Sequence, residues 1–231
     1  VYGILRCSFL MRTPWKAIFR VFIIKKECFF MTQKQKTHHL AVAALLAAVA
    51  AVLQFVEFSI PIMPAFVKLD VSDLPALLGT FSLGPVYGVA IQLVKNLLHL
   101  PFGSSACVGE LSNFLLGATF AFIAGIIYKK HKNRSGALWG SVAGAAAMAL
   151  ISLPLNYFIV YPAYVVLYGL PLEGIVGMYE AILGTVAHVP TGNALFNCLL
   201  VFNVPFTLCK GLLDVALCFL IYKPLSPLLH K

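Results

Sequence analysis

The chain alternates long apolar segments with short polar or proline-containing stretches. A helix needs about 20 apolar residues to cross the hydrocarbon core of a bilayer. By this measure the pattern predicts six spans, at residues 39–57, 73–89, 90–101, 107–128, 136–160 (possible extension to 168) and 198–222. The third of these is short and ends at Pro101. The predicted fold class is therefore all-α, an integral membrane bundle of six transmembrane helices.

Two connecting segments are long enough to have structure of their own. Residues 58–72 contain two prolines and two charged residues, and residues 169–195 contain glycine, proline, two glutamates and a histidine. We expect the second to be an external loop with a short helix. The chain shows no internal repeat, which weakens the case for a secondary transporter built from two related halves.

Residues 1–30 differ from the rest, with six basic residues, one acidic residue and few turn signals. The apolar stretch at residues 21–24 is too short for a signal-peptide core of about 7–15 residues. We interpret residues 1–30 as a basic N-terminal extension. It either precedes a native start at Met31 or lies on the membrane surface. Residues 31–231 then form the six-span membrane domain.

Composition supports membrane insertion, because 61% of residues are hydrophobic and only 11% are charged. A soluble domain carries about 25% charged residues. Six spans leave no room for a soluble catalytic domain, and the phosphate-binding pattern GxxxxGK[ST] is absent, so the chain itself is not expected to hydrolyse ATP. The six cysteines form no CxxC pair and indicate small buried apolar residues, with no metal ligands expected.

The net charge of +9 bears on orientation. The densest basic run, residues 129–134, follows an even-numbered span and so lies on the same side as both basic ends of the chain. Cytoplasmic loops of membrane proteins are enriched in Lys and Arg. We therefore expect a multi-pass protein of the cell membrane with both termini in the cytoplasm and the loops 58–72 and 169–195 outside.

The first of these loops is a candidate binding site. Lys68, Asp70 and Asp73 lie in a compact charged stretch between two apolar segments. Charges close to hydrocarbon are costly and tend to be retained for function.

The first span has a face of small residues, because Ala43, Ala47 and Ala51 recur at every fourth position. Such faces allow a second helix to approach closely in lipid. This face either docks a partner helix or packs within the same chain.

The outer end of the fifth span combines an amide, Asn156, with aromatic neighbours that include Tyr157 and Tyr161. Asn donates and accepts hydrogen bonds, which suits the edge of a pyrimidine-like ring, and aromatic faces stack on such a ring. The alternative for the tyrosines is an aromatic belt at the membrane surface.

In the last span, Asn203, Thr207 and Lys210 share one helix stripe and can donate to ligand carbonyls and hydroxyls. The alternative is a structural ion pair between Lys210 and Asp214, four residues further on.

Polar residues also occur in the middle of the chain. Lys95 and Glu110 could neutralise each other across the bundle, and Asn96 and Asn113 could join this network or contact a ligand. Neither HExxH nor GxSxG is present, so no catalytic or metal-binding residues are predicted, and we do not expect an enzyme.

Several motifs together resemble the riboflavin-specific S component family of energy-coupling factor (ECF) vitamin transporters. They are Lys68-Leu69-Asp70-Val71-Ser72-Asp73-Leu74-Pro75, Lys95-Asn96-Leu97-Leu98-His99, Gly109-Glu110-Leu111-Ser112-Asn113-Phe114, Asn156-Tyr157-Phe158 and Pro205-Phe206-Thr207-Leu208-Cys209-Lys210-Gly211. The resemblance covers about residues 31–231.

The resemblance implies a six-span bundle that binds riboflavin near the outer face as a transported ligand, with no cofactor. It implies ATP-driven uptake with a coupling transmembrane subunit and two ATP-binding-cassette ATPases. It also implies that Asn156 and Lys210 contact the flavin and that the alanine face docks the coupling subunit. The pocket residues include no arginine cluster, which favours riboflavin over flavin mononucleotide. The alternatives are an S component for another vitamin and, less well supported, a standalone secondary transporter or a small membrane enzyme.

Overall fold

The computed structural model describes residues 33–60, 63–64, 67–103, 107–169, 171–183 and 194–229. The predicted extension at residues 1–30 lies outside the described residues. The chain divides into two units, residues 1–40 and 41–231. The described part of the first unit forms the first turns of helix α2 (Gln33–Gln54). The packing below concerns residues 41–231.

The described residues are mostly helical, as predicted. After α2 come two short strands, β1 (Phe58–Ser59) and β2 (Lys68–Leu69), and then a series of helices. These are α3 (Asp73–Leu83), α4 (Pro85–His99), α5 (Val108–Lys130), α6 (Arg134–Leu155), α7 (Tyr161–Tyr168), α8 (Leu172–Leu183), α9 (Ala194–Cys198) and α10 (Val204–Leu229). Two π-helical turns, η1 (Asn156–Val160) and η3 (Leu199–Asn203), join α6 to α7 and α9 to α10.

Four helical segments among the described residues are long and apolar enough to cross a membrane. They are Gln35–Gln54, Val108–Lys130, Arg134–Leu167 and Leu195–Ile221. They agree with the predicted first, fourth, fifth and sixth spans. The predicted external loop does contain a short helix, α8.

The predicted second span, residues 73–89, is wrong as a single helix. α3 ends at Leu83, Gly84 has a φ of 109°, and α4 begins at Pro85. A positive φ is accessible to glycine because it has no Cβ, and proline fits the first turn of a new helix. The third segment therefore runs from Pro85 to His99, instead of 90–101. α3 and α4 have 11 and 15 residues, which is short for a span.

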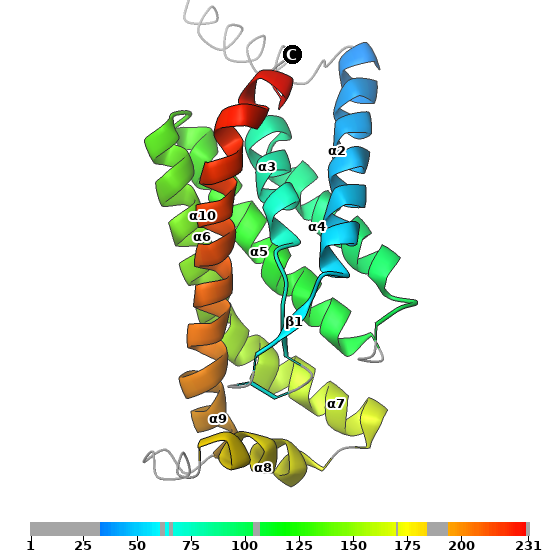
Figure 1. Cartoon of the computed structure of the whole chain (residues 1–231), viewed down its shortest axis with the longest axis vertical. Helices are drawn as coiled ribbons and strands as arrows, with labels where there is room; N and C mark the ends of the chain where they lie inside the picture. Colours follow the sequence, from blue (N-terminus) through cyan, green and yellow to red (C-terminus); the bar gives the residue numbers. More distant parts are fainter. Residues whose placement is uncertain are drawn as a thin grey trace, which may run out of the picture. The chain divides into compact units, whose positions relative to one another are not determined.

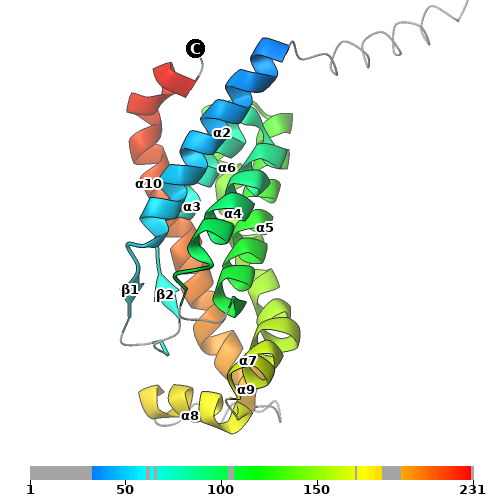
Figure 2. The same ribbon diagram turned by 90° about the vertical axis from the view of Figure 1, so that its right-hand side faces the viewer.

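The long helices pack side by side: α5 lies between α4 and α6, and α10 contacts α6 and α3. The contact of α5 with α6 depends on small residues. A Cβ added to Gly140 or Gly144 would lie 2.8–2.9 Å from a backbone oxygen of α5. Figure 1 and Figure 2 show α8 and the β1–β2 ladder toward one end of this unit, with the α5–α6 turn and the end of α10 at the other.

The β1–β2 ladder is a detail that an all-α prediction does not include. The strands are antiparallel, with Phe58 opposite Leu69 and Ser59 opposite Lys68. Lys68 also forms an ion pair with Glu57, just before β1. The strand pairing and this ion pair fix the position of Lys68, and Asp70 follows directly after β2.

Candidate functional site

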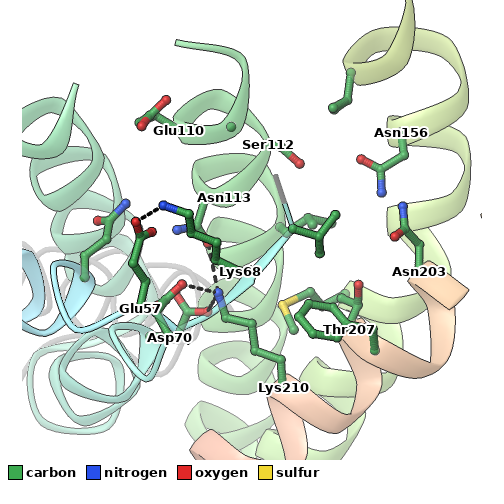
Figure 3. A pocket seen from close by; sticks show the side chains of 18 of the residues that line it. Glu57, Lys68, Asp70, Glu110, Ser112, Asn113, Asn156, Asn203, Thr207 and Lys210 are labelled. Carbon is green, nitrogen blue, oxygen red and sulfur yellow. Dashed lines mark hydrogen bonds and ion pairs between the residues drawn. The ribbon is translucent and has the colours of Figure 1, made fainter. Parts of the chain in front are cut away.

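A cavity opens between the β1–β2 ladder, α5, η1, α7 and α10, with about 1050 Å³ of empty space including its mouth. The lining mixes apolar and polar side chains, and Figure 3 shows them converging from elements far apart in sequence. The lining residues are Gln54, Glu57, Val67, Lys68, Asp70, Asp73, His99, Gly109, Glu110, Ser112, Asn113, Leu116, Met148, Asn156, Val160, Tyr161, Tyr164, Asn203, Phe206, Thr207 and Lys210.

One side of the cavity carries two amides, Asn156 and Asn203, which point toward one another in Figure 3. Each lies in a π-helical turn, η1 or η3. Such turns interrupt the regular helix and often occur at functional sites. Pro154 precedes η1 and cannot donate a helical hydrogen bond, which favours an irregularity here. The two amide side chains are thus available to the same ligand.

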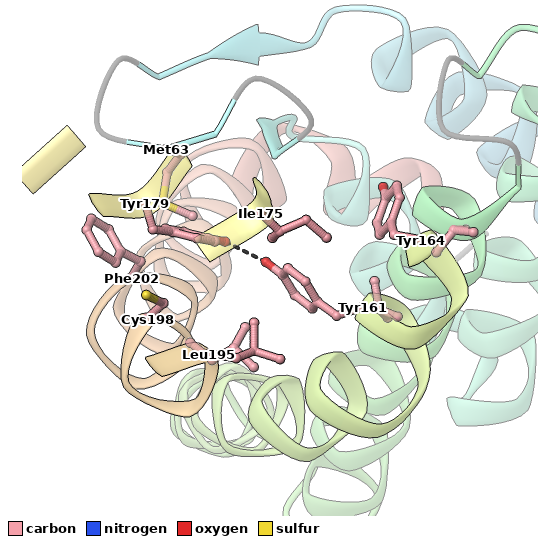
Figure 4. Close-up of a cluster of buried hydrophobic side chains, with 11 residues drawn as sticks. Met63, Tyr161, Tyr164, Ile175, Tyr179, Leu195, Cys198 and Phe202 are labelled. Atoms are coloured by element: carbon pink, nitrogen blue, oxygen red, sulfur yellow. Dashed lines mark hydrogen bonds between the residues drawn. The ribbon is translucent and has the colours of Figure 1, made fainter. Parts of the chain in front are cut away.

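Three hydrogen-bonding groups close the cavity toward α8. Tyr161 and Tyr179 have their hydroxyls 2.5 Å apart (Figure 4). The Tyr179 hydroxyl donates to Asn203 Oδ1 at 3.3 Å, and Asn203 Nδ2 donates to the Tyr161 hydroxyl at 3.3 Å. The triangle joins α7, α8 and η3 within an apolar cluster that includes Ile175 and Phe202. Burial raises the pKa of Tyr179, which keeps its hydroxyl protonated.

The opposite side of the cavity is an ionic network centred on Lys210. Lys210 Nζ donates to Asp70 Oδ2 at 2.8 Å and to Asn113 Oδ1 at 3.2 Å, and lies 3.7 Å from Asp73 Oδ2. Ser72 donates to Asp70 Oδ1 through its backbone N–H at 2.9 Å and through its hydroxyl. Burial alone would raise the pKa of Asp70, but the Lys210 and Lys95 ammonium groups lower it well below its usual range. Asp70 is therefore ionised.

A second buried lysine, Lys95 of α4, extends this network through Ser72 and Asp73. Its Nζ donates to Asp73 Oδ1 at 2.5 Å and to Ser72 Oγ at 2.7 Å, and Gln92 Nε2 donates to Asp73 Oδ1 at 2.8 Å. The predicted neutralisation of Lys95 by Glu110 is wrong. Glu110 instead approaches His99 Nδ1 at 3.1 Å, since His99 ends α4 and Glu110 lies in the first turn of α5.

The alternative prediction of a Lys210–Asp214 ion pair is also wrong in this structure. The Lys210 side chain extends toward Asp70 and the cavity. Asp214 is fully buried, and neither of its carboxyl oxygens has a hydrogen-bond partner within the described part of the chain. The spacing of Lys210 and Asp214 on one helix allowed the pair, but the Lys210 ammonium group pairs with the carboxylates of Asp70 and Asp73 instead.

The structure brings together most of the binding residues suggested by the sequence. The cavity is lined by eight of them: Lys68, Asp70, Asn113, Asn156, Tyr161, Asn203, Thr207 and Lys210. Tyr157 and Asn96 do not line it. Tyr157 packs against the aromatic rings of Phe158 and Phe196. Asn96 is engaged within the bundle, since it accepts from Gln54 Nε2 of α2 and donates to the Gln92 carbonyl of its own helix.

Sequence reasoning did not single out some lining residues, among them Gln54, Glu57, Ser112 and Met148. Glu57 and Gln54 follow the apolar stretch of α2, where polar residues are expected anyway. No group of three or more His, Cys, Asp or Glu side chains that could hold a metal ion occurs among the described residues. The arrangement suits a neutral ring compound with hydrogen-bonding edges.

The predicted docking residues Ala43, Ala47 and Ala51 are buried within this chain, and Ala47 is only 1% exposed. Ala43 and Ala47 pack in one cluster with Ala76 of α3 and Ile91 of α4. This position agrees with the alternative of packing within the chain. The small residues that α2 leaves exposed in residues 41–54 are Ala41, Ala44 and Ala48.

The long apolar helices and the open cavity of mixed polar and apolar lining define a membrane-embedded small-molecule binding protein. The family described as "ECF transporter, substrate-specific component" has a sequence model that matches residues 38–222. The chain belongs to this family. The membership confirms the predicted family and the expectation of a transport component in place of an enzyme.

Named relatives cover most of the chain. "Riboflavin transporter RibU" of Staphylococcus aureus (strain TCH60) is 32% identical over 85% of this chain and 95% of its own length. "Riboflavin transporter FmnP" of Bacillus subtilis (strain 168) is 28% identical over 85% of this chain and 96% of its own. A solved structure, titled "Structure and mechanism of the S component of a bacterial ECF transporter", has a TM-score of 0.62 at 32% identity. It covers 85% of this chain and 100% of the other.

Proposed function

We propose that this chain binds riboflavin in the cavity between Asn156 and Lys210, as the substrate-binding subunit of an ECF importer. The observation that carries the proposal is the convergence of two amides and a tyrosine on a cavity whose far side is polar. The family membership and the names of the relatives support the same ligand.

The lining chemistry suits both parts of this vitamin. Asn156 and Asn203 can pair with the alternating carbonyl and N–H groups of the flavin ring, and Tyr161 offers an aromatic face. Lys210 is directed to the ligand hydroxyls and carbonyls. An ammonium group has three donors, and Lys210 uses one on Asp70 and one on Asn113, so one remains for a ligand. Thr207, one turn before Lys210, adds a hydroxyl.

The membrane arrangement that we propose has six spans within residues 31–231. Four are the long helices, and α3 and α4 are two shorter ones, supported by the apolar composition of both. Both termini then lie in the cytoplasm, because the basic run 129–134 requires it under the positive-inside rule. The cavity opens toward the outer face, near the β1–β2 ladder.

We further propose that uptake requires a coupling transmembrane subunit and two ATPases, as in other members of the family. The docking surface that fits best is the exposed small-residue side of α2, with Ala44 and Ala48 four residues apart. Small residues allow close helix approach in lipid. The buried residues Ala43, Ala47 and Ala51 would pack the other side of α2 against the rest of this chain.

The test is a titration of riboflavin fluorescence with the purified protein in detergent. Quenching with one site per chain is expected, and Asn156→Ala or Lys210→Ala should weaken it. Cys209→Ala is the matched control, since Cys209 neighbours Lys210 on α10 but is exposed outside the lining. Absence of binding by well-folded protein would contradict the riboflavin assignment and favour the second candidate, an S component for another vitamin on the same fold.

A further inference from the structure

A second cavity lies between the turn that joins α5 to α6 and the helices α3 and α10, and it shares no lining residue with the first. Its empty space is about 670 Å³ including the mouth. It is lined by Phe81, Tyr128, Lys132, Asn133, Arg134, Ala137, Cys218 and Phe219. In Figure 1 and Figure 2 the α5–α6 turn and the end of α10 lie at the end of the unit opposite α8.

The inside of this cavity is apolar. The rings of Phe81 and Tyr128 meet edge to face, with centroids 4.9 Å apart, and form one wall. Ala137 and Cys218 are buried at the base, and Phe219 is half-buried beside them. These side chains belong to one apolar cluster shared by α3, α5, α6 and α10. A hydrocarbon chain is therefore a suitable occupant of the interior.

The mouth of the cavity is cationic. Lys132 and Arg134 line it, both side chains are exposed, and neither forms an ion pair among the described residues. The sequence supplies no acidic residue between Glu110 and Glu173, and none after Asp214. Asp214 itself is fully buried in α10. The positive charge at the mouth therefore has no counter-charge in its own part of the chain.

The backbone adds to this positive potential. α6 begins at Arg134, and Asn133 caps it by accepting the Gly136 N–H at 2.6 Å. The N-terminal end of a helix carries a partial positive charge that favours anions. An apolar interior, a cationic mouth and a helix N-terminus thus meet within one cavity of a membrane protein.

We propose that this cavity binds an anionic phospholipid, with the phosphate at Lys132 and Arg134 and the start of an acyl chain against Phe81 and Tyr128. Basic pockets between membrane helices suit acidic headgroups. The inference does not depend on which ligand the first cavity takes.

Native mass spectrometry of the detergent-purified full chain tests the proposal, with phosphatidylglycerol or phosphatidylcholine added in equal amounts. The parent chain should retain phosphatidylglycerol preferentially. Lys132→Gln with Arg134→Gln should lower that retention by about thirtyfold, since each of the two basic residues near a lipid surface contributes about 1 kcal/mol. The control pair Lys129→Gln with Lys130→Gln removes the same charge from exposed positions outside the lining. It should leave retention within about twofold, because Lys129 and Lys130 do not line the cavity and so do not contact the phosphate of a lipid bound there.

Further variants and probes distinguish lipid binding in this cavity from a general effect of charge and from binding of a soluble phosphate compound. Ala137→Leu fills the base without changing charge and should also reduce phosphatidylglycerol retention. Unfolding temperatures without lipid show whether each variant is folded. Equal loss from both charge pairs, or full retention in Ala137→Leu, would overturn the cavity as the lipid site. Displacement of the lipid by millimolar inorganic phosphate or glycerol 3-phosphate would also overturn the proposal, in favour of a site for a soluble phosphate compound.

Discussion

Asp70 and Lys210 are 140 residues apart and form an ion pair of 2.8 Å at one side of the cavity. The pair ties the loop after β2 to α10, and both side chains are at most 10% exposed. Removing one member of a buried pair leaves an uncompensated charge, which typically costs about 3–5 kcal/mol. We expect Lys210→Met to lower the free energy of unfolding by about that amount, measured by denaturant or thermal unfolding in detergent.

The double variant Asp70→Asn with Lys210→Met is the control. It removes both charges, so it should be more stable than Lys210→Met alone. If the single variant cost less than about 1 kcal/mol, a value typical of exposed pairs, the pair would have no structural role and Lys210 would serve ligand binding alone.

The lowered pKa of Asp70 predicts how the ion pair responds to pH. Burial opposes ionisation, but Lys210 and then Lys95 outweigh it, so the pKa in the folded state lies below the unfolded value of about 3.9. The stabilisation is then present above the unfolded pKa and is lost only as pH falls through the folded pKa. The difference in unfolding free energy between the parent and Asp70→Asn should be constant from pH 8 to pH 5. A difference that shrinks between pH 7 and pH 5 would contradict this.

The hydroxyl triangle predicts a stabilising role for α8. Tyr179 contributes one hydroxyl, which contacts Tyr161 and Asn203. Tyr179→Phe removes it and leaves two buried polar partners less satisfied, so a loss of about 1–3 kcal/mol is expected. Because burial raises the pKa of Tyr179, its stabilisation is complete below the unfolded pKa of about 10 and decreases at higher pH. Unfolding at pH 7 and pH 11 should show the parent approaching Tyr179→Phe only at the higher pH.

Hydropathy was enough to predict the four long helices, because each is a continuous apolar segment long enough to cross a membrane. It failed at Gly84, where a single residue with positive φ divides one apolar run into α3 and α4. The candidate residues Asn156, Asn203 and Lys210 could be identified because polar groups within apolar helices are conspicuous. Their partners could not, since the pairing of Lys95 with Asp73 depends on how α3 and α4 pack. Spacing similarly identified an alanine face on α2 without indicating what it faces.

The two sides of α2 give a matched pair of variants. Ala47 is 1% exposed and packs in the cluster with Ala76 and Ile91, so Ala47→Leu should overpack the core and cost about 1–3 kcal/mol. Ala48 is exposed, and Ala48→Leu should leave stability and flavin binding unchanged while reducing uptake in cells. Both readouts are needed: unfolding of the purified variants and accumulation of labelled riboflavin. Normal uptake by a stably expressed Ala48→Leu would contradict docking at this side of α2.

The charges of the cavity predict discrimination against the phosphate ester of the vitamin. Four carboxyl groups line the cavity, from Glu57, Asp70, Asp73 and Glu110, against the two lysines Lys68 and Lys210. Both lysines already pair with carboxylates, so a buried phosphate would meet no free cation and several like charges. We expect flavin mononucleotide to bind at least about tenfold more weakly than riboflavin, since uncompensated burial of charge is costly. Glu57→Gln with Glu110→Gln should narrow this ratio, measured as two dissociation constants for each protein by fluorescence titration. An equal affinity of the parent for both flavins would mean that the phosphate stays outside the cavity, in contact with water.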